Sequence, residues 1–366
     1  MTSEVTEDLS RAAEDLFRRE LARPGGRQAA HNAGWSEELW TATASAGWFD
    51  VLLSEEHGGL DLGSEAAAAL FTLLGRYLVP GPYLDHLVVI PALYRYASRH
   101  VRDRFDLART GSQLIVLADP AACGRSAATD VPMLVGEDLT GTVPLVRFGA
   151  TASGFVVIAR TGANRGAVVF VDGAAPGVTT APRQSFDPVS AQADLRLDHV
   201  RVSGDAVLLP SDEVMTNATV RRLRTTLRLM IAAELAGLAR YLLDSSVAYA
   251  KLRKQFGRPI GSFQAVQQIL GEMAVLVHGA EAYSAEFAAR PDPDPAETAA
   301  LKGFASRTAR QVGESALQVH GGIAFTEELE LNRWFLRALT LQGLYGDDIE
   351  SFHETGNALL KGTLQP

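Results

Sequence analysis

The residues best suited to bind a charged ligand lie in one short stretch, Arg253-Lys-Gln-Phe-Gly257. The guanidinium group of Arg253 could donate two parallel hydrogen bonds to a pyrophosphate and would keep its charge when partly desolvated. Gln255 and Phe256 stand beside it, and Phe256 could pack on the same ligand. The alternative interpretation is a surface arginine in an i,i+4 ion pair next to an ordinary core phenylalanine.

A pair of helices is expected to position this stretch. The run from Leu227 to Leu252 carries Ala, Leu and Met on all sides, which predicts a buried helix, and Gly257 and Pro259 would end it. Ser262 is expected to cap a second helix, because apolar residues then recur at helical spacing. These residues are Val266, Ile269, Leu270, Met273 and Val277.

A second candidate contact lies in the segment Gln318-Val-His-Gly-Gly322. Gly321 and Gly322 would let a backbone approach a ligand closely, since no side chain intervenes, and Gln318 stands one helical turn before them. A helix C-cap without a ligand explains the same glycines. His320 and His57 receive no catalytic role, because neither has a visible partner in the sequence.

Together the two segments resemble the flavin-contacting segments of the acyl-CoA dehydrogenase family. The second is similar to that family's Gln-x-x-Gly-Gly-x-Gly-Phe signature, and Leu39-Trp40, Gly47-Trp48 and Glu56-His-Gly-Gly-Leu60 extend the likeness over nearly the whole chain. The resemblance implies FAD as cofactor, bound between the β-domain and the C-terminal helices. It also implies that a neighbouring subunit holds the adenylate end, contacted by Gln318, Gly321 and Gly322.

Composition narrows the functional classes. The chain has 366 residues with 47% hydrophobic composition, which is ample for a large core. Its net charge of −9 argues against a nucleic-acid partner. Cys123 is the only cysteine, so no intrachain disulfide can form. An acidic N-terminus without a signal pattern, and no run long enough to span a membrane, make the cytoplasm the expected location.

The order of sequence patterns predicts an α+β fold. Residues 1–112 show helical periodicity, residues 113–208 contain short apolar runs bounded by Gly, Asp and Pro, and residues 209–366 return to helical periodicity. We therefore expect an N-terminal helical domain, a middle β-domain and a C-terminal four-helix bundle. This is the layout that the resemblance implies.

The resemblance also shows what is missing. The family removes the α-proton of an acyl-CoA with a glutamate, most often in Tyr-Glu-Gly-Thr, whereas this chain has Leu344-Tyr-Gly-Asp-Asp348. The matching position is Gly346. A second known location, on the helix before the arginine corner, falls on Leu227. Asp347 and Asp348 remain weak candidates for a displaced base.

The β-domain departs from the family as well. Its Thr-Glu-Pro and Gly-Ser-Asp segments correspond here to Ala118-Asp-Pro120 and Cys123-Gly-Arg125, so a hydroxyl is lost. Its Trp-x-Thr-Asn-like strand corresponds to Val143-Pro-Leu-Val-Arg147, which lacks the threonine that would hydrogen-bond the flavin. The segments that would contact a neighbour's adenylate are therefore kept, whereas the segments that would contact this chain's own flavin ring are altered.

These departures resemble the glutamate-lacking subunits of actinobacterial α2β2 steroid acyl-CoA dehydrogenases. The hypothesis is a subunit that, with a glutamate-bearing homologous partner, converts an acyl-CoA substrate to a 2-enoyl-CoA and passes electrons to an electron-transfer flavoprotein. Three alternatives stay open: a homo-oligomeric dehydrogenase with a displaced aspartate base, a flavin monooxygenase on the same fold, and a non-catalytic assembly subunit. The acyl group is not specified, although a steroid side chain or another bulky group fits the resemblance.

Overall fold

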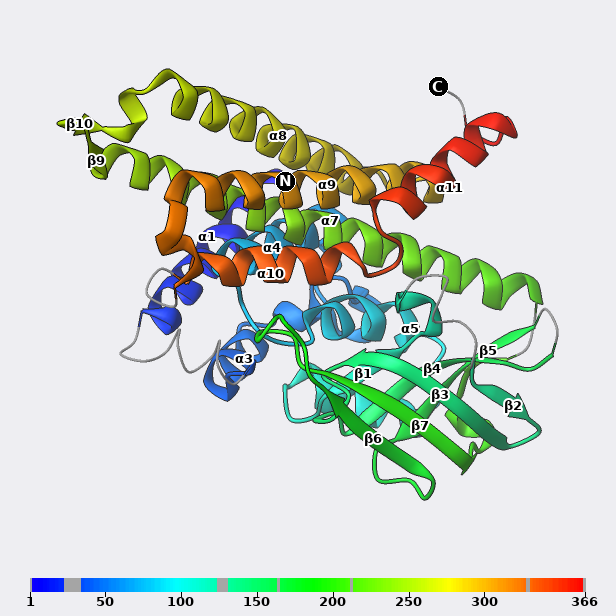
Figure 1. Ribbon diagram of the computed structural model, residues 1–366. Helices are drawn as coiled ribbons and strands as arrows, with labels where there is room; N and C mark the ends of the chain where they lie inside the picture. The colour runs from blue at the N-terminus through cyan, green and yellow to red at the C-terminus, as the bar shows by residue number, and fades with distance from the viewer. Residues whose placement is uncertain are drawn as a thin grey trace. The chain divides into compact units, whose positions relative to one another are not determined.

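The computed structural model of the protein describes residues 2–22, 34–123, 131–162, 165–210, 213–326 and 330–364. Helices come first, a β-sheet follows, and long helices complete the chain (Figure 1). This order confirms the predicted α+β fold class. The helices before the sheet are α1 (Thr2–Leu21), α3 (Glu37–Ser45), α4 (Gly63–Tyr77), α5 (Ile90–Tyr94) and α6 (Arg99–Arg109).

The chain divides by packing into two compact units. The helical unit contains Met1–Arg19, Ser64–Val79 and Arg228–Pro366, and the sheet-containing unit contains Glu20–Gly63 and Pro80–Leu227. Each unit is therefore built from segments distant in sequence. The division into consecutive domains at residues 1–112, 113–208 and 209–366 stays a prediction.

The sheet-containing unit is built on an eight-stranded sheet with the order β6-β7-β3-β2-β4-β5-β8, and β1 pairs in parallel with β4. Two backbone N–H groups on the free edge of β1 donate to consecutive side chains of a π-helical turn. Asp85 accepts from Leu117 N–H at 2.7 Å, and His86 accepts from Ile115 N–H at 3.3 Å. The strands are β1 (Ile115–Ala118), β2 (Met133–Val135), β3 (Asp138–Arg147), β4 (Gly154–Arg160), β5 (Gly166–Asp172), β6 (Val178–Arg183), β7 (Gln192–Arg201) and β8 (Val207–Leu209).

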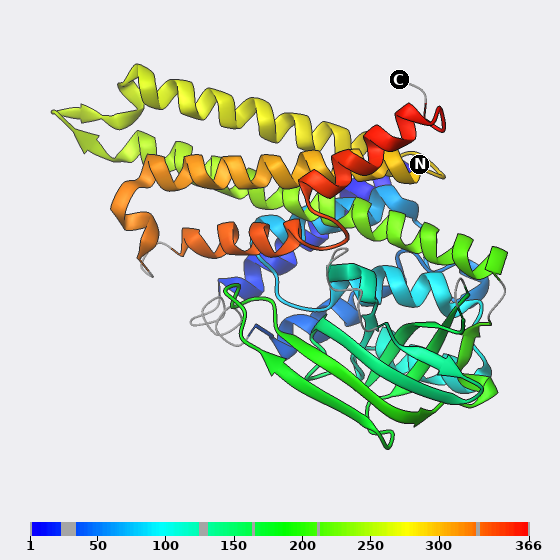
Figure 2. The same ribbon diagram turned by 45° about the vertical axis from the view of Figure 1, so that its right-hand side comes forward.

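Long helices make up most of the helical unit. In both views α8, α9 and the second half of α7 lie side by side (Figures 1 and 2). Asp294 caps α9 by accepting from two backbone N–H groups. Ser262 does not cap α8: Phe263 occupies that position and the Ser262 hydroxyl donates to Pro259 O, so this prediction was wrong. The helices are α7 (Glu213–Leu252), α8 (Gln264–Ala288), α9 (Pro295–His320), α10 (Leu331–Gln342) and α11 (Asp348–Leu360).

Two glycines allow α4 and α7 to touch through their backbones. A Cβ atom on Gly75 would lie 2.0 Å from Glu234 O, and one on Gly237 would lie 1.9 Å from Thr72 O. At the same crossing the carboxylate of Glu234 pairs with Arg337 of α10 at 2.9 Å, both side chains being almost fully buried. Breaking such a pair would leave an uncompensated buried charge, so it fixes α10 against α7.

Replacing Gly237 by alanine should therefore push α4 and α7 apart and lower the free energy of unfolding by about 1–3 kcal/mol. Gly271 of α8 is the matched control, because a Cβ there meets nothing within 4 Å. Gly271→Ala should raise stability by about 0.5–1 kcal/mol through helix propensity. Thermal unfolding of the two variants tests this, and shifts of the same sign would contradict the close crossing.

Candidate cofactor and active site

The end of α7 continues into a two-stranded hairpin, β9 (Lys254–Gln255) and β10 (Arg258–Pro259), which projects beyond the helices (Figure 1). Its two turn residues, Phe256 and Gly257, both have positive φ, 53° and 78°. Phenylalanine is disfavoured in that conformation, yet Phe256 is also 92% exposed. Its ring contacts the Phe263 ring edge-on, with centroids 6.2 Å apart, and its large exposed surface suits contact with a ligand or a partner.

The hairpin region is also cationic. Arg253, Lys254 and Arg258 are exposed, and within the described part of the chain none of them forms an ion pair. The guanidinium of Arg258 instead lies 4.3 Å from the centre of the Phe263 ring. On a chain of net charge −9 these cations form a local site for an anion.

The end of α9 meets this region. The Tyr249 ring of α7 stacks on the His320 ring of α9, with centroids 4.5 Å apart. Gly321 follows with φ 66°, and among the described residues a Cβ on Gly321 or Gly322 would meet nothing within 4 Å. This open backbone suits the close approach of a ligand. Gln318, also exposed, lies on the last turn of α9.

The turn between α10 and α11, which carries Gly346, is held from within by cations. Tyr345 and Gly346 both have positive φ, 55° and 97°. Arg228 donates to Tyr345 O at 3.0 Å, and Lys302 donates to the carbonyls of Gly346 and Gln342. The backbone of this turn is therefore fixed by charged donors beneath it.

Both candidate replacement bases serve the structure of this turn. Asp347 caps α11 by accepting from Glu350 N–H at 2.8 Å. Asp348 is buried, accepts from Gln342 Nε2 at 3.0 Å and pairs with Arg307 at 3.2 Å. At the other known location, Leu227 is an apolar residue with 1% exposure. A base must come within hydrogen-bond reach of the substrate, and these carboxylates are already engaged.

Sequence reasoning missed Lys302. Its side chain is fully buried, and burial lowers the pKa of its ammonium group to about 7, with the charge of Arg228 acting in the same direction. Asp347, Asp348 and Glu350 act in the opposite direction. The signal in the sequence is a lysine on the helical face of Thr298, Ala305 and Ala309, which are all buried.

In the sheet-containing unit, the segments that correspond to flavin-ring contacts are bonded within the chain. Asp119 is fully buried, and its two carboxylate oxygens accept hydrogen bonds from Nη2 and Nε of Arg224 at 2.7 and 2.8 Å. Leu145 N–H donates to Asp194, and the Cys123 thiol donates to Pro144 O. Gly124 and Arg125 lie outside the described residues. Asp119, Leu145 N–H and the Cys123 thiol therefore already have hydrogen-bond partners within the chain.

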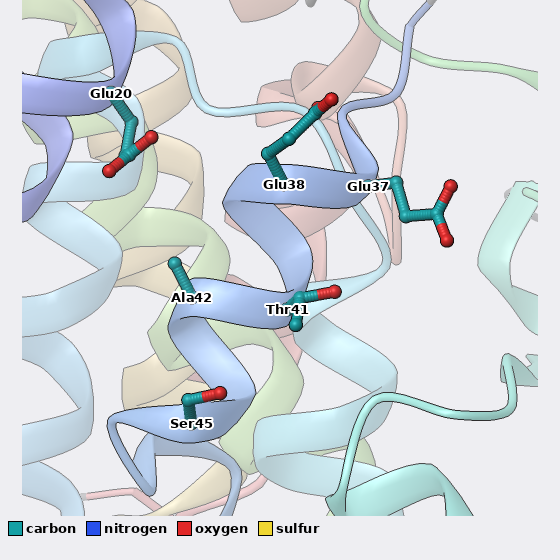
Figure 3. Close-up of a pocket in the computed structure, with 6 residues that line it drawn as sticks. All are labelled: Glu20, Glu37, Glu38, Thr41, Ala42 and Ser45. Atoms are coloured by element: carbon teal, nitrogen blue, oxygen red, sulfur yellow. The ribbon is translucent and has the colours of Figure 1, made fainter.

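A surface hollow elsewhere in this unit has the wrong charge for such a ligand. Figure 3 shows its lining, Glu20 together with Glu37, Glu38, Thr41, Ala42 and Ser45, which brings three carboxylates and, among the described residues, no cation. The described residues contain no cluster of three or more side chains suited to hold a metal ion. None of their helices has both the length and the apolar character needed to cross a bilayer.

Comparison with known proteins identifies the family. The acyl-CoA dehydrogenase N-terminal domain matches residues 3–108, and the acyl-CoA dehydrogenase C-terminal domain matches residues 219–348. The chain belongs to the acyl-CoA dehydrogenase family. This confirms the predicted family and its class, a flavoprotein oxidoreductase, and with it FAD as the cofactor. An FADH2 complex and an FAD complex are among the solved structures with this fold.

The relatives include two acyl-CoA dehydrogenases of Mycobacterium tuberculosis. FadE34 is 29% identical over 94% of this chain, which spans only 47% of that protein's length. FadE27 is 28% identical over 89% of this chain and 88% of its own. The ChsE4-ChsE5 complex of the same organism superimposes with a TM-score of 0.88 at 25% identity, covering 99% of this chain and 98% of that one. A Tcur3481-Tcur3483 steroid ACAD gives 0.83 at 25% identity, covering 99% of both chains.

The residues present fit one part of FAD best. Arg253, the exposed Phe256 and the open glycine pair suit the phosphates and a flat ring of the nucleotide, whereas Asp119 and Leu145 N–H in the ring-contact segments of the other unit are bonded within the chain. The roles of Arg253, Gln255, Phe256, Gln318, Gly321 and Gly322 stay predictions that this geometry supports.

Lys302 generates a prediction about pH. Because its pKa is about 7 in the folded chain and 10.5 is the ordinary value, the unfolded chain binds more protons between these limits. The stability contributed by Lys302 should therefore rise as pH rises above about 7, on the order of 2 kcal/mol by pH 9. Lys302→Met should lack this slope.

Urea unfolding of the wild type and of Lys302→Met at pH 7 and pH 9 tests this. Subtracting the two removes the contribution of every other titrating group. A difference in free energy of unfolding that does not change with pH would contradict the burial of a titrating amine.

Proposed function

We propose that this chain is the glutamate-lacking subunit of an FAD-dependent acyl-CoA dehydrogenase. A homologous partner would supply the carboxylate that removes the α-proton of the thioester. Bound FAD would accept the β-hydride, which gives a 2-enoyl-CoA. The similarity to the ChsE4-ChsE5 complex and to a steroid ACAD supports a bulky acyl group such as a steroid side chain.

The observation that carries this proposal is the turn at Gly346. The position that matches the family's glutamate has no side chain, and the neighbouring Asp347 and Asp348 are engaged as a helix cap and a buried ion pair. Moving either aspartate to a substrate would break those interactions. Removing the α-proton therefore requires a carboxylate from outside this chain.

The chain's own contribution is the cationic hairpin with the glycine pair. Charge-assisted hydrogen bonds from Arg253 would hold the pyrophosphate, and the backbone at Gly321 and Gly322 would lie against the adenylate. Because these groups project from the helix ends, the flavin they contact would be one shared with a neighbouring subunit. Electrons would then leave to an electron-transfer flavoprotein.

Two alternatives are less well supported. A homo-oligomer with a displaced aspartate base needs Asp347 or Asp348 to be free, and both are bonded. A monooxygenase on this fold needs no base, but it needs a flavin ring held for reaction with oxygen, and Asp119 and Leu145 N–H in the ring-contact segments are bonded within the chain.

The first prediction of this proposal concerns turnover. The purified chain alone should show little or no acyl-CoA dehydrogenase activity, because the loss of a general base removes about 10²–10⁴-fold in rate. Co-expression with a glutamate-bearing homologue should restore it. Dye reduction with a panel of acyl-CoAs, including steroid side-chain thioesters, measures both. Brisk turnover by the pure chain that is lost on Asp347→Asn would instead make Asp347 the base.

A second prediction concerns Arg253. In the co-expressed complex, Arg253→Ala should weaken FAD binding by about one to two decades, because a charge-assisted hydrogen bond contributes about 1.5–3 kcal/mol. Arg11→Ala is the control, since Arg11 is an exposed arginine of the same unit that pairs with Asp8 and, within the described part of the chain, with no other carboxylate. Titration of the apo-complex with FAD gives both affinities, and equal values for the two variants would refute the assignment.

A further inference from the structure

The Tyr249 and His320 rings join the two parts of the proposed cofactor site. Tyr249 stands four residues before Arg253 on α7, and His320 stands directly before Gly321 on α9. Their planes are 30° apart, and His320 is 5% exposed. His320 is therefore buried and Tyr249 half-buried where the last turns of the two helices meet.

The His320 ring is held in one orientation. Its Nδ1 lies 2.8 Å from Ala316 O, so Nδ1 carries a proton and donates to that carbonyl. Burial lowers the pKa of the His320 ring, which keeps the ring neutral near pH 7. Its Nε2 is buried and has no hydrogen-bond partner among the described residues. The His320 ring is therefore fixed by the hydrogen bond at Nδ1 and by stacking on the Tyr249 ring.

Short backbone bonds carry the position of each ring to the site. Arg253 N–H donates to Tyr249 O at 2.8 Å, and Ile260 N–H donates to Arg253 O at 2.8 Å, so the base of the hairpin moves with Tyr249. On the other side, α9 ends at His320, and the C-cap residue Gly321 donates its N–H to Leu317 O.

We propose that the Tyr249–His320 stack is a positioning device for the cofactor. It sets the distance between the cationic hairpin and the glycine pair, so that both meet one dinucleotide. This inference rests on the proposed function, and it adds two residues that neither the motif around Arg253 nor the glycine signature assigns. Both act through their neighbours, because their contact sets where Arg253 and Gly321 stand relative to one another.

The test is FAD affinity in the co-expressed complex, measured by titrating the apo-complex and following flavin fluorescence. Tyr249→Leu and His320→Leu should each weaken FAD binding about three- to ten-fold, comparable to the energy of an aromatic pair. The double variant should be no weaker than either single one, because one interaction is removed in all three. His320→Phe keeps a ring in the stack and should bind FAD like the wild type.

Tyr283→Leu is the control for loss of a ring. Tyr283 of α8 packs edge-on against Phe287, so its loss should lower the unfolding temperature and leave FAD affinity unchanged. If the Tyr249–His320 stack had a purely structural role, Tyr249→Leu and His320→Leu would also lower the unfolding temperature and leave FAD affinity unchanged. That result would overturn the proposal.

Two further outcomes also overturn it. Additive losses in the double variant would mean that the rings act separately. A loss in His320→Phe as large as in His320→Leu would mean that Nε2 matters and not the stack. Failure of the proposed function looks different, because Arg253→Ala would then leave FAD affinity unchanged whatever the stack variants do.

Discussion

The contact between the backbones of α4 and α7 is the constraint on which the helical unit depends. Gly75 and Gly237 each face a carbonyl of the other helix, so neither helix can slide or rotate without a clash. Glu234 lies at the same crossing, and its pairing with Arg337 extends the constraint to α10. From this fixed point α7 runs toward the turn held by Arg228 in one direction and toward Tyr249 and the hairpin in the other. The turn held by Arg228 and the hairpin are therefore both positioned by α7.

Charge is used differently at the two ends. Beneath the Gly346 turn, Lys302 and Arg228 donate to carbonyls, and the nearby carboxylates are engaged with cations or a helix N-terminus. At the hairpin, Arg253 and its neighbouring cations have no acid partner in the described part of the chain. The inner donors hold a backbone through hydrogen bonds, whereas the outer cations are left for an anion from outside. The division explains how a chain without a free base can still contribute to a flavin site.

Much of this could be predicted from the sequence, because the informative signals are local. Helical and strand periodicity indicated the order of elements, and the resemblance of the segments around Arg253 and Gly321 to known motifs indicated the family. The rest depends on contacts between distant segments. In the sequence, Lys302 resembles a surface lysine. In the structure it donates to the carbonyls of Gln342 and Gly346, and Gly346 is more than forty residues away along the chain. His320 lacked a visible partner for the same reason, since Tyr249 lies on another helix.

The account's central claim is that this chain holds only part of a flavin site. The most direct measurement is the flavin content of the purified chain, alone and after co-expression with a glutamate-bearing homologue. We predict little FAD on the pure chain and about one FAD for each pair of unlike chains in the complex. One FAD retained by every copy of the pure chain, without any partner, would contradict the claim.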